Sequence, residues 1–272
     1  MTSIQQSFVF LETPDGTLRV EVIRRETYEG LPPLLVYVFG GAWMAGDRHQ
    51  VAHSPLPAFV AQGYALASLD YRHSQVATFP AQILDVKSGI GWLRQNAERL
   101  GFDSGRIGIF GPSAGGHLAA LVGTTSGTPH FVPDGYSAQD CVVQAVVDLF
   151  GPTDFLQMDA HSISDEIIHD DPGSPESRLI GGAIQHHPKA VKTANPVTYV
   201  NGSEPPFLII HGDQDPLVPL HQSELLANAL SDAGSVHRLV VDEQGGHGSG
   251  GTFNSEAMAT DILSFLDYHL KP

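Results

Sequence analysis

Short apolar runs alternate along the chain with longer segments in which apolar residues recur every third or fourth position. A short run bounded by turn residues predicts a buried strand, whereas the longer period predicts a helix with one apolar face. The predicted strands are residues 18–23, as an edge strand, and then 34–39, 64–69, 106–110, 142–150, 206–211 and 236–241. The predicted helices are residues 80–100, 114–123, 219–233 and 254–270. This alternation indicates an α/β fold, with a mostly parallel sheet covered by helices on both faces.

The segment from Pro152 to Pro205 interrupts the alternation. It is polar and rich in Pro, Gly, Ser, Asp and His, and it is too long for a plain connection within a compact domain. One interpretation is an irregular insertion that carries short helices, and the other is a lid over a pocket. We treat residues 1–272 as one domain, with 152–205 as its insertion.

Composition excludes several classes of function. The net charge of −16 and the absence of Lys/Arg clusters argue against a nucleic-acid partner. No apolar stretch is long enough to cross a membrane, so we expect no membrane association. No signal peptide is visible, which favours the cytoplasm, although a secreted chain whose signal had been removed would look the same. Cys141 is the single cysteine, so no internal disulfide can form, and we expect a buried, unreactive thiol.

Candidate chemistry begins at Gly111-Pro112-Ser113-Ala114-Gly115, which follows a predicted strand and precedes a predicted helix. This is the G-x-S-x-G pattern of a nucleophile elbow, a turn so tight that the residues two before and two after the serine must be nearly free of side chain. The turn would place the Ser113 hydroxyl at the N-terminus of a helix, where a developing negative charge is stabilised.

A serine hydroxyl needs a base, and in this arrangement the acid and the base follow the serine along the chain, each after a strand. Asp213 and Asp215 both follow the strand at 206–211, and His247 lies between glycines after the strand at 236–241. We favour Asp215, because Asp213 lies so close to the strand end that it is better placed to cap the turn. His117 and His237 are interpreted as structural.

These motifs resemble the α/β-hydrolase superfamily over nearly the whole chain, and in particular the carboxylesterases related to hormone-sensitive lipase and the feruloyl and acetyl-xylan esterases. The resemblance rests on the serine motif, on His211 to Pro219 (H-G-D-Q-D-P-L-V-P), and on Gly246-His247-Gly248. It implies an α/β-hydrolase fold and a catalytic set of Ser113, Asp215 and His247.

The resemblance also explains the glycines that follow the strand at 34–39. In such esterases an H-G-G-G-W loop supplies backbone N–H groups to an oxyanion hole, and this chain has Phe39-Gly40-Gly41-Ala42-Trp43. Gly41 and Ala42 are the implied donors together with Ala114, Gly40 is an alternative donor, and Trp43 is expected to contact substrate. Phe39 replaces the histidine of the pattern and Ala42 replaces its last glycine.

The implied reaction is two-step acyl transfer that requires no metal and no organic cofactor. The histidines at 161, 169, 186 and 187 lack the spacing of a metal site. We expect a small-molecule or polysaccharide-linked ester with a short or aromatic acyl group. An amidase or formamidase on the same triad and a catalytically silent ligand-binding protein are the alternatives.

Overall fold

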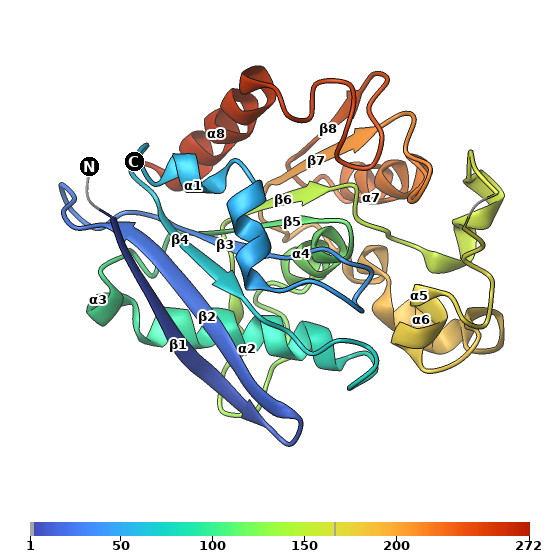
Figure 1. The fold of residues 1–272 in the computed structure, drawn as a ribbon, viewed down its shortest axis with the longest axis horizontal. Coiled ribbons are helices and arrows are strands. Elements are labelled where there is room, and N and C mark those ends of the chain that lie inside the picture. Colours follow the sequence, from blue (N-terminus) through green and yellow to red (C-terminus); the bar gives the residue numbers. More distant parts are fainter. Residues whose placement is uncertain (1–2, 166) are drawn as a thin grey trace.

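The computed structural model describes residues 3–165 and 167–272, which contain an eight-stranded sheet in the order β1-β2-β4-β3-β5-β6-β7-β8 (Figure 1). β1 and β2 pair antiparallel, β2 pairs antiparallel with β4, and all the other neighbours are parallel. The strands are β1 (Ser3–Thr13), β2 (Gly16–Arg25), β3 (Leu34–Val38), β4 (Ala65–Leu69), β5 (Ile107–Pro112), β6 (Ala145–Leu149), β7 (Phe207–Gly212) and β8 (His237–Asp242). The expected α/β-hydrolase topology, a largely parallel sheet with an antiparallel start, is therefore present.

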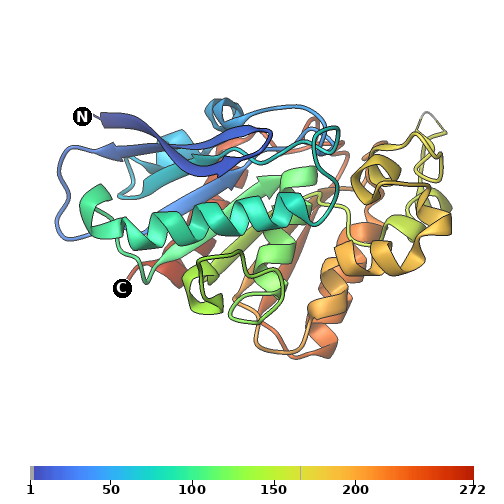
Figure 2. The same ribbon diagram turned by 90° about the horizontal axis from the view of Figure 1, so that it is seen from below.

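Helices cover both faces of this sheet. Helices α2 (Ala81–Gln95) and α4 (Ala114–Thr124) lie on one face, with α7 (His221–Asp232) beside β7 and β8 (Figure 2). The other face carries α8 (Glu256–Leu270), the short α1 (Leu56–Phe59) and the 3-10 helix η1 (Arg48–His53). A methyl group on Gly108 of β5 would lie 2.8 Å from the Leu270 side chain, so α8 packs directly on the strand backbone.

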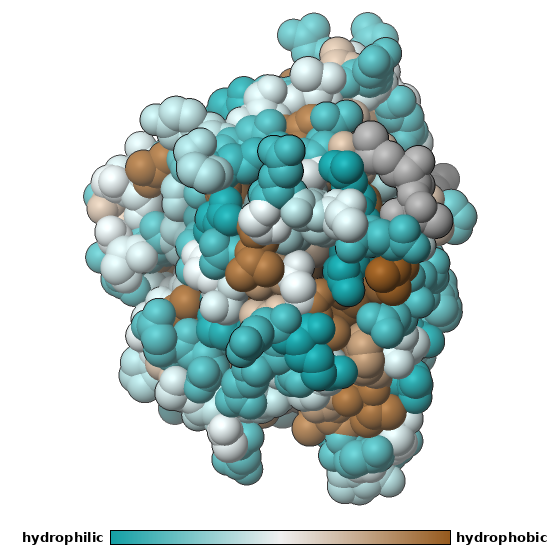
Figure 3. Space-filling view, turned by 90° about the vertical axis from the view of Figure 1, so that its left-hand side faces the viewer, coloured by the Kyte–Doolittle hydropathy of each residue, from teal (hydrophilic) through white to brown (hydrophobic). Residues whose placement is uncertain are grey.

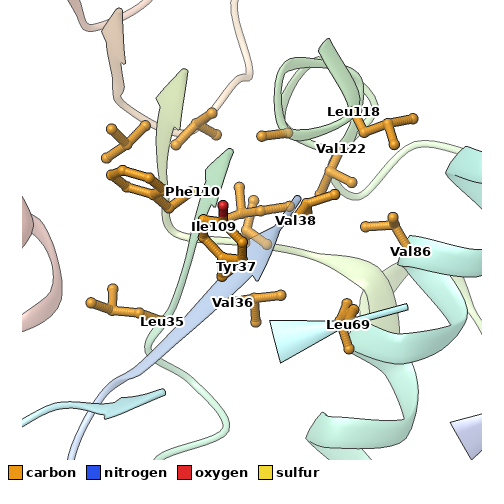
Figure 4. Packing of buried hydrophobic residues seen from close by; sticks show 14 of the residues in the cluster. Leu35, Val36, Tyr37, Val38, Leu69, Val86, Ile109, Phe110, Leu118 and Val122 are labelled. Atoms are coloured by element: carbon orange, nitrogen blue, oxygen red, sulfur yellow. The ribbon is translucent and has the colours of Figure 1, made fainter. Parts of the chain in front are cut away.

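The core consists of two apolar layers, one on each side of the sheet (Figure 4). Leu35, Tyr37 and Phe110 lie on the face covered by α8, whereas Val38 and Val122 lie on the face covered by α4. Alternation along β3 places successive side chains in different layers, which is why the whole strand is buried. The continuous apolar run in the sequence reflects this burial on both faces.

The predicted strands and helices are present, most of them with bounds shifted by one or two residues, and two differ more. The strand predicted at 142–150 begins only at Ala145, because Cys141 ends the 3-10 helix η2 (Ala138–Cys141). The helix predicted at 80–100 is interrupted at Asn96, which separates α2 from α3 (Ala97–Leu100). The side-chain amide of Asn96 donates a hydrogen bond to the Trp92 carbonyl at 2.8 Å, in addition to the bond at 3.1 Å from its own backbone N–H. Gly101 ends α3 in the left-handed conformation, with φ of 77°.

The prediction that residues 18–23 form an edge strand was wrong. β2 lies between β1 and β4, and Val20 and Val22 are buried there. The edge is β1, which sequence reasoning missed because its apolar residues are interspersed with Gln and Ser. Pro14-Asp15 joins β1 to β2 as a short hairpin connection, and Thr13 pairs with Gly16. This Pro-Asp-Gly turn was the available signal.

The insertion contains the short helices that one interpretation of the sequence expects. These are α5 (Pro175–Ile180), α6 (Pro188–Ala194) and the 3-10 helices η3 (Phe155–Gln157), η4 (Asp159–His161), η5 (Ile184–His186) and η6 (Pro196–Tyr199). The insertion lies at the right of Figure 1, on the side to which the arrowheads of β6 and β7 point. It therefore lies at the carboxyl ends of the parallel strands, where α/β folds place their ligand sites.

The surface seen in Figure 3 is covered mostly by hydrophilic side chains, with hydrophobic residues gathered towards the lower right of that view. Within residues 3–165 and 167–272, no helix combines the length and the apolar character needed to span a membrane. Cys141 is buried, and burial raises the pKa of its thiol to about 11, so the thiol is unreactive at neutral pH as expected.

Candidate active site

Ser113 occupies the sharp turn between β5 and α4. Its backbone has φ of 55° and ψ of −123°, a strained conformation for a residue with a side chain. Its N–H donates to the Leu149 carbonyl at 2.8 Å, and its own carbonyl accepts from the His117 N–H at 2.9 Å. The serine is thus fixed at the first turn of a helix, in the geometry that the sequence motif predicts.

The glycines of the motif are required sterically. A methyl group on Gly111 would lie 2.2 Å from the Gly115 carbonyl oxygen, and one on Gly115 would lie 2.1 Å from the Val38 carbonyl oxygen. A methyl group on Gly40 would lie 2.9 Å from the Pro112 carbonyl oxygen and 3.5 Å from Ser113 Cβ. These contacts bring the backbone of the loop after β3 against the nucleophile turn.

The structure brings Asp215 and His247 together, although they lie on separate loops. His247 Nδ1 donates to Asp215 Oδ2 at 2.7 Å, and Asp215 is 2% exposed. A carboxylate accepts hydrogen bonds, so Nδ1 carries the proton and Nε2 is left as the basic nitrogen. That is the tautomer required of a general base for a serine hydroxyl.

Asp215 is held by donors on both oxygens. Oδ1 accepts from the N–H groups of Leu217 and Val218 at 2.8 and 2.9 Å, while Oδ2 lies 3.4 Å from His211 Nε2 in addition to its bond with His247. Burial alone would raise the pKa of Asp215, but the hydrogen bonds from His211 and His247 outweigh burial and lower that pKa below its ordinary value. Asp215 is therefore ionised throughout the neutral range.

His211 was part of the sequence motif but received no role from it. The buried ring lies with Nε2 2.8 Å from the Val218 carbonyl and with Nδ1 2.7 Å from Ser223 Oγ. Because a carbonyl only accepts, Nε2 carries the proton and also faces Asp215, while Nδ1 accepts from the Ser223 hydroxyl. His211 thus fixes the loop that carries the acid.

Asp213, the weaker candidate for the acid, connects the two loops. Its Oδ1 accepts from the Gln244 N–H at 2.8 Å, and its N–H donates to the Asp242 carbonyl at 3.2 Å. A methyl group on Gly212 would lie 2.1 Å from the Gly245 carbonyl oxygen, so the loops touch backbone to backbone. The Asp213 side chain thus joins the loops after β7 and β8, whereas the sequence analysis expected it to cap the turn at its own strand end.

Ser113 and His247 border the same region, but no hydrogen bond joins the Ser113 hydroxyl to any residue in the described ranges. The Phe150 ring lies 4.5 Å from the His247 ring, and Phe150 directly follows Leu149, whose carbonyl holds Ser113. Pro112 and Gly248, the chain neighbours of the serine and the histidine, line one cavity. Catalytic contacts of this kind are often long without substrate and tighten when it binds.

The loop after β3 presents unused backbone donors beside the serine. Gly41 has φ of 117° and Ala42 has φ of 54°. These two consecutive positive angles make the loop turn sharply. Within residues 3–165 and 167–272, the N–H groups of Gly40, Gly41, Ala42 and Ala114 donate to no backbone carbonyl. Such donors beside a nucleophile can bind a negatively charged oxygen, as the sequence analysis expects. Ala42 tolerates the strained angle in place of the glycine of the pattern.

Other contacts anchor this loop where the expected histidine is missing. The buried Phe39 ring stacks on Tyr71, with ring centres 4.1 Å apart, and the Tyr71 hydroxyl donates to the Phe39 carbonyl at 3.1 Å. The Ser74 N–H donates to the Trp43 carbonyl at 2.8 Å, and His73 Nε2 lies 3.1 Å from the Gly46 carbonyl. The segment after β4 therefore holds the loop by stacking and hydrogen bonds, which the sequence alone did not indicate.

Comparison with known proteins gives the family of the chain. The sequence model of the family described as BD-FAE matches residues 21–230. The chain belongs to the BD-FAE family. It has the α/β-hydrolase fold, and the relatives named below are esterases.

Individual relatives support the same assignment. Esterase LipC of Mycobacterium tuberculosis is 33% identical over 79% of this chain and 53% of its own length, and esterase LipQ of the same organism is 32% identical over 86% and 55%. The chain thus spans about half the length of these curated relatives. A solved carbohydrate esterase from gut microbiota superposes with a TM-score of 0.85 at 30% identity, covering 100% of this chain and 97% of that one.

The expected contact of Trp43 with substrate is at odds with its position in this BD-FAE domain. Trp43 is 1% exposed, and its Nε1 donates to His117 Nδ1 at 3.2 Å. His117 Nε2 in turn donates to the Ala194 carbonyl at 2.8 Å, and burial lowers the His117 pKa to about 4. His117 is structural, as predicted, and Trp43 ties the loop after β3 to α4 and α6 instead of facing a ligand.

The other histidines named in the sequence analysis form separate contacts. His161 stacks on His221 with ring centres 3.4 Å apart, and His169 Nδ1 lies 3.1 Å from Glu176 Oε1. Among the residues that the structure describes, no group of three His, Cys, Asp or Glu side chains is arranged to hold a metal ion. His237 Nδ1 lies 3.0 Å from the Ser235 carbonyl at the start of β8, a structural position.

Asp148 is a buried carboxyl group beneath the nucleophile helix. It is 1% exposed, and Oδ1 accepts from the Gly151 N–H at 2.9 Å, whereas Oδ2 has no partner in the described part of the chain. A methyl group on Gly116 would lie 2.3 Å from Oδ1, so the carboxyl group packs against the first turn of α4. Burial raises the pKa of Asp148 to about 7, and the bond from Gly151 offsets this only in part.

The raised pKa of Asp148 makes the stability of the fold depend on pH, and replacing Asp148 by asparagine removes this dependence. A carboxyl group whose pKa is raised on folding binds more protons in the native than in the unfolded state, so stability falls as the pH rises between the two pKa values. For Asp148 that window runs from 3.8 to about 7. Asp148→Asn keeps the shape and the acceptor for Gly151 but does not titrate. We measure the free energy of unfolding in urea for the variant and the wild type. We expect the difference between them, variant minus wild type, to increase with pH across this window and to stay constant above it. A difference that is constant with pH would contradict the assignment.

Proposed function

We propose that this BD-FAE domain is a serine carboxylesterase that hydrolyses short-chain or aromatic acyl esters through an acyl-enzyme. The observation that carries the proposal is the 2.7 Å hydrogen bond from His247 Nδ1 to the buried Asp215 carboxylate. In the neutral imidazole that bond places the proton on Nδ1, so Nε2 is free to accept one. His247 lies on a loop that borders the same cavity as the turn bearing Ser113. A base of this kind beside a strained serine is suited to acyl transfer.

In the first step, His247 Nε2 accepts the Ser113 proton as Oγ attacks the ester carbonyl carbon. Asp215 stabilises the imidazolium that forms and keeps its orientation. The carbonyl oxygen gains negative charge and accepts hydrogen bonds from the N–H groups of Ala114 and of Gly41 or Ala42. Gly40 remains the alternative donor. Because these donors are already in place, they stabilise the charge without reorganisation.

The first half of the reaction ends when His247 gives its proton to the oxygen of the leaving alcohol and Ser113 retains the acyl group. In the second half, a water molecule transfers a proton to His247 Nε2 as its oxygen attacks the acyl carbon. His247 then returns that proton to Ser113 Oγ, which releases the carboxylic acid and restores the serine. Each step moves a proton or the acyl group between groups that the chain itself supplies. The proposed reaction therefore needs no metal and no organic cofactor.

An ester linked to a polysaccharide is the proposed natural substrate class. Support comes from the solved carbohydrate esterase, which matches the chain over its full length at 30% identity. A carbohydrate alcohol is bulky and hydrophilic, so we expect it to stay in contact with water instead of entering an apolar pocket. The acyl group would then be the part of the substrate that the protein encloses.

We also propose that the chain acts as one domain and that the insertion, residues 152–205, acts as a lid. The insertion is tied to the nucleophile helix through the bond of His117 to Ala194 in α6. Beyond that anchor it exposes Ile163 and Ile168, each 60% exposed, and Leu217 beside the acid is 37% exposed. Apolar side chains left uncovered on an insertion at the carboxyl ends of the strands are suited to closing over a substrate.

The choice between the two candidate acids can be tested directly. Asp215→Asn should lower kcat/KM by at least about a hundredfold, because the amide favours the wrong tautomer of His247. Asp213→Asn is the matched control. Its amide oxygen can still accept from the Gln244 N–H, so we expect a loss of less than about tenfold. Steady-state kinetics on one ester, with folding checked by circular dichroism, give the comparison. The acid is misassigned if the Asp213 variant proves the more damaged.

The reaction class can be tested with p-nitrophenyl esters set beside matched anilides. We expect the esters to be cleaved at least about a hundredfold faster, and acetate or butanoate at least about tenfold faster than decanoate. The polar insertion offers little apolar area to compensate for holding a long chain at about 25 cal/mol per Å². A preference for anilides would support an amidase instead, and a maximum at dodecanoate would indicate a lipase.

A further inference from the structure

The buried ring of His117 joins the insertion to the loop after β3. His117 lies in the first turn of α4, four residues after Ser113, and is 0% exposed. Its Nδ1 lies 3.2 Å from Trp43 Nε1, and its Nε2 lies 2.8 Å from the Ala194 carbonyl oxygen at the end of α6. An indole N–H only donates and a carbonyl only accepts, so both bonds require the same tautomer of a neutral imidazole. Burial lowers the pKa of His117 to about 4, which keeps the ring in that form at neutral pH.

The insertion makes a second contact with the same pair of rings. Phe155 in η3 is fully buried, with its ring centre 5.4 Å from that of Trp43 and 5.3 Å from that of His117. The Trp43 and His117 rings meet edge to face, with centres 5.1 Å apart and planes at 85°. Because these three buried rings come from separate segments and pack against one another, a movement of one displaces the others. Two parts of the insertion, η3 near its start and α6 near its end, therefore hold this pair in place.

Trp43 belongs to the strained part of the loop after β3. Ala42 and Trp43 have φ of 54° and 56°, a left-handed conformation that residues with side chains rarely adopt. Such a conformation persists only where surrounding contacts hold it. The Trp43 indole is held by His117, and the Trp43 carbonyl accepts from the Ser74 N–H at 2.8 Å. The bond to His117 is thus one of the anchors that keep the backbone of residues 42–43 in this conformation.

The same stretch of backbone directs the Ala42 N–H. The Gly41 carbonyl accepts from the N–H groups of Met44 and Ala45 at 2.9 and 3.0 Å. The peptide bond between Gly41 and Ala42 is trans, so its N–H points away from that carbonyl. Within residues 3–165 and 167–272, this N–H donates to no backbone carbonyl. It is a proposed donor to the oxyanion, and its direction depends on the turn that Trp43 anchors.

Packing alone does not require polar groups at this place. Two apolar side chains would fill the volume of Trp43 and His117 without burying polar atoms, which cost free energy unless they are paired. The two hydrogen bonds add direction. One fixes the indole relative to α4, and the other fixes α4 relative to α6.

We propose that His117 is a positioning residue for the oxyanion hole, through which the seating of the insertion determines where the Ala42 N–H lies. This rests on the proposed esterase function and adds a residue that acts on the transition state without touching the substrate. His117 takes no part in the proton transfers. The oxyanion forms only as the reaction proceeds, so a displaced donor lowers kcat and leaves KM largely unchanged.

Two substitutions separate the two bonds of His117. His117→Asn places an amide oxygen near the position of Nδ1, where it can still accept from Trp43, but the shorter side chain does not reach the Ala194 carbonyl. Trp43→Phe keeps an aromatic ring and removes the N–H, while His117 can still donate to Ala194. Complete loss of one oxyanion donor costs about 10²–10³ in rate, so for a displaced donor we expect kcat on p-nitrophenyl acetate to fall about tenfold in each variant. KM should stay within about twofold of the wild-type value.

Trp92→Phe is the matched control, because it is the same replacement on α2, where the Trp92 ring packs against that of Phe8 with centres 5.6 Å apart. It should keep both kcat and KM. The ketone 1,1,1-trifluoro-2-butanone provides a readout that a loss of packing alone would not change. Ser113 Oγ adds to its carbonyl carbon while His247 takes the hydroxyl proton, and the oxyanion of the resulting hemiketal occupies the hole. The inhibition constant of the ketone should rise about tenfold in both variants and stay at the wild-type value in the control.

Circular dichroism and urea unfolding show whether each variant is folded, and His117→Asn carries the test if Trp43→Phe is not. If the folded variants keep the wild-type kcat and inhibition constant, His117 has only a structural role and the proposal is wrong. If only one of two folded variants loses activity, the two bonds do not act as one path, and the proposal is equally wrong. A rise in KM with an unchanged inhibition constant also contradicts it. If the wild type neither cleaves p-nitrophenyl acetate nor binds the ketone, the proposed esterase function fails as well.

Discussion

The buried carboxylate of Asp215 is the constraint on which the catalytic end of this molecule depends. A carboxylate that is 2% exposed would take up a proton unless hydrogen bonds stabilised its charge. Leu217, Val218 and His211 supply donors from its own side, and His247 supplies the last one from the neighbouring loop. These donors keep Asp215 ionised, and the ionised Asp215 in turn fixes the tautomer and direction of His247. In the proposed mechanism, the basicity that His247 offers to Ser113 is thus a consequence of how the neighbouring groups stabilise a buried charge.

Close backbone contacts make that arrangement rigid. The loops after β3, β5, β7 and β8 meet at one edge because parallel strands end on the same side of the sheet. Glycines allow them to touch: Gly115 lies against Val38, Gly40 against Pro112, and Gly212 against Gly245. A side chain at any of these glycines would push two catalytic loops apart. The glycine-rich motifs are therefore steric requirements of assembling the site, and Ser113 is held in its strained conformation by the contacts around it.

Much of this could be predicted from the sequence, because the motifs are local. The strand before Ser113 and the helix after it follow from the apolar pattern, and the choice of Asp215 over Asp213 follows from distance to the strand end. Features that depend on contacts between distant segments could not be predicted. The sequence pattern predicts that Trp43 contacts substrate. In the structure Trp43 is hydrogen-bonded in the core to His117, which lies far along the chain. β1 was missed because one of its faces is polar, and the cavity lined by Pro112 and Gly248 exists only once η1 and α8 are placed over the sheet.

The central claim is that Ser113 is a nucleophile activated by the His247–Asp215 pair. A fluorophosphonate reacts with activated serines far faster than with ordinary ones, because the attacking oxygen must be deprotonated as it displaces fluoride. Mass spectrometry of the intact protein and of its peptides after brief exposure at neutral pH reports the site directly. We expect a single adduct, located on the peptide that contains Ser113, and no adduct in Ser113→Ala. An adduct on another residue, or a folded protein that remains unlabelled, would contradict the claim.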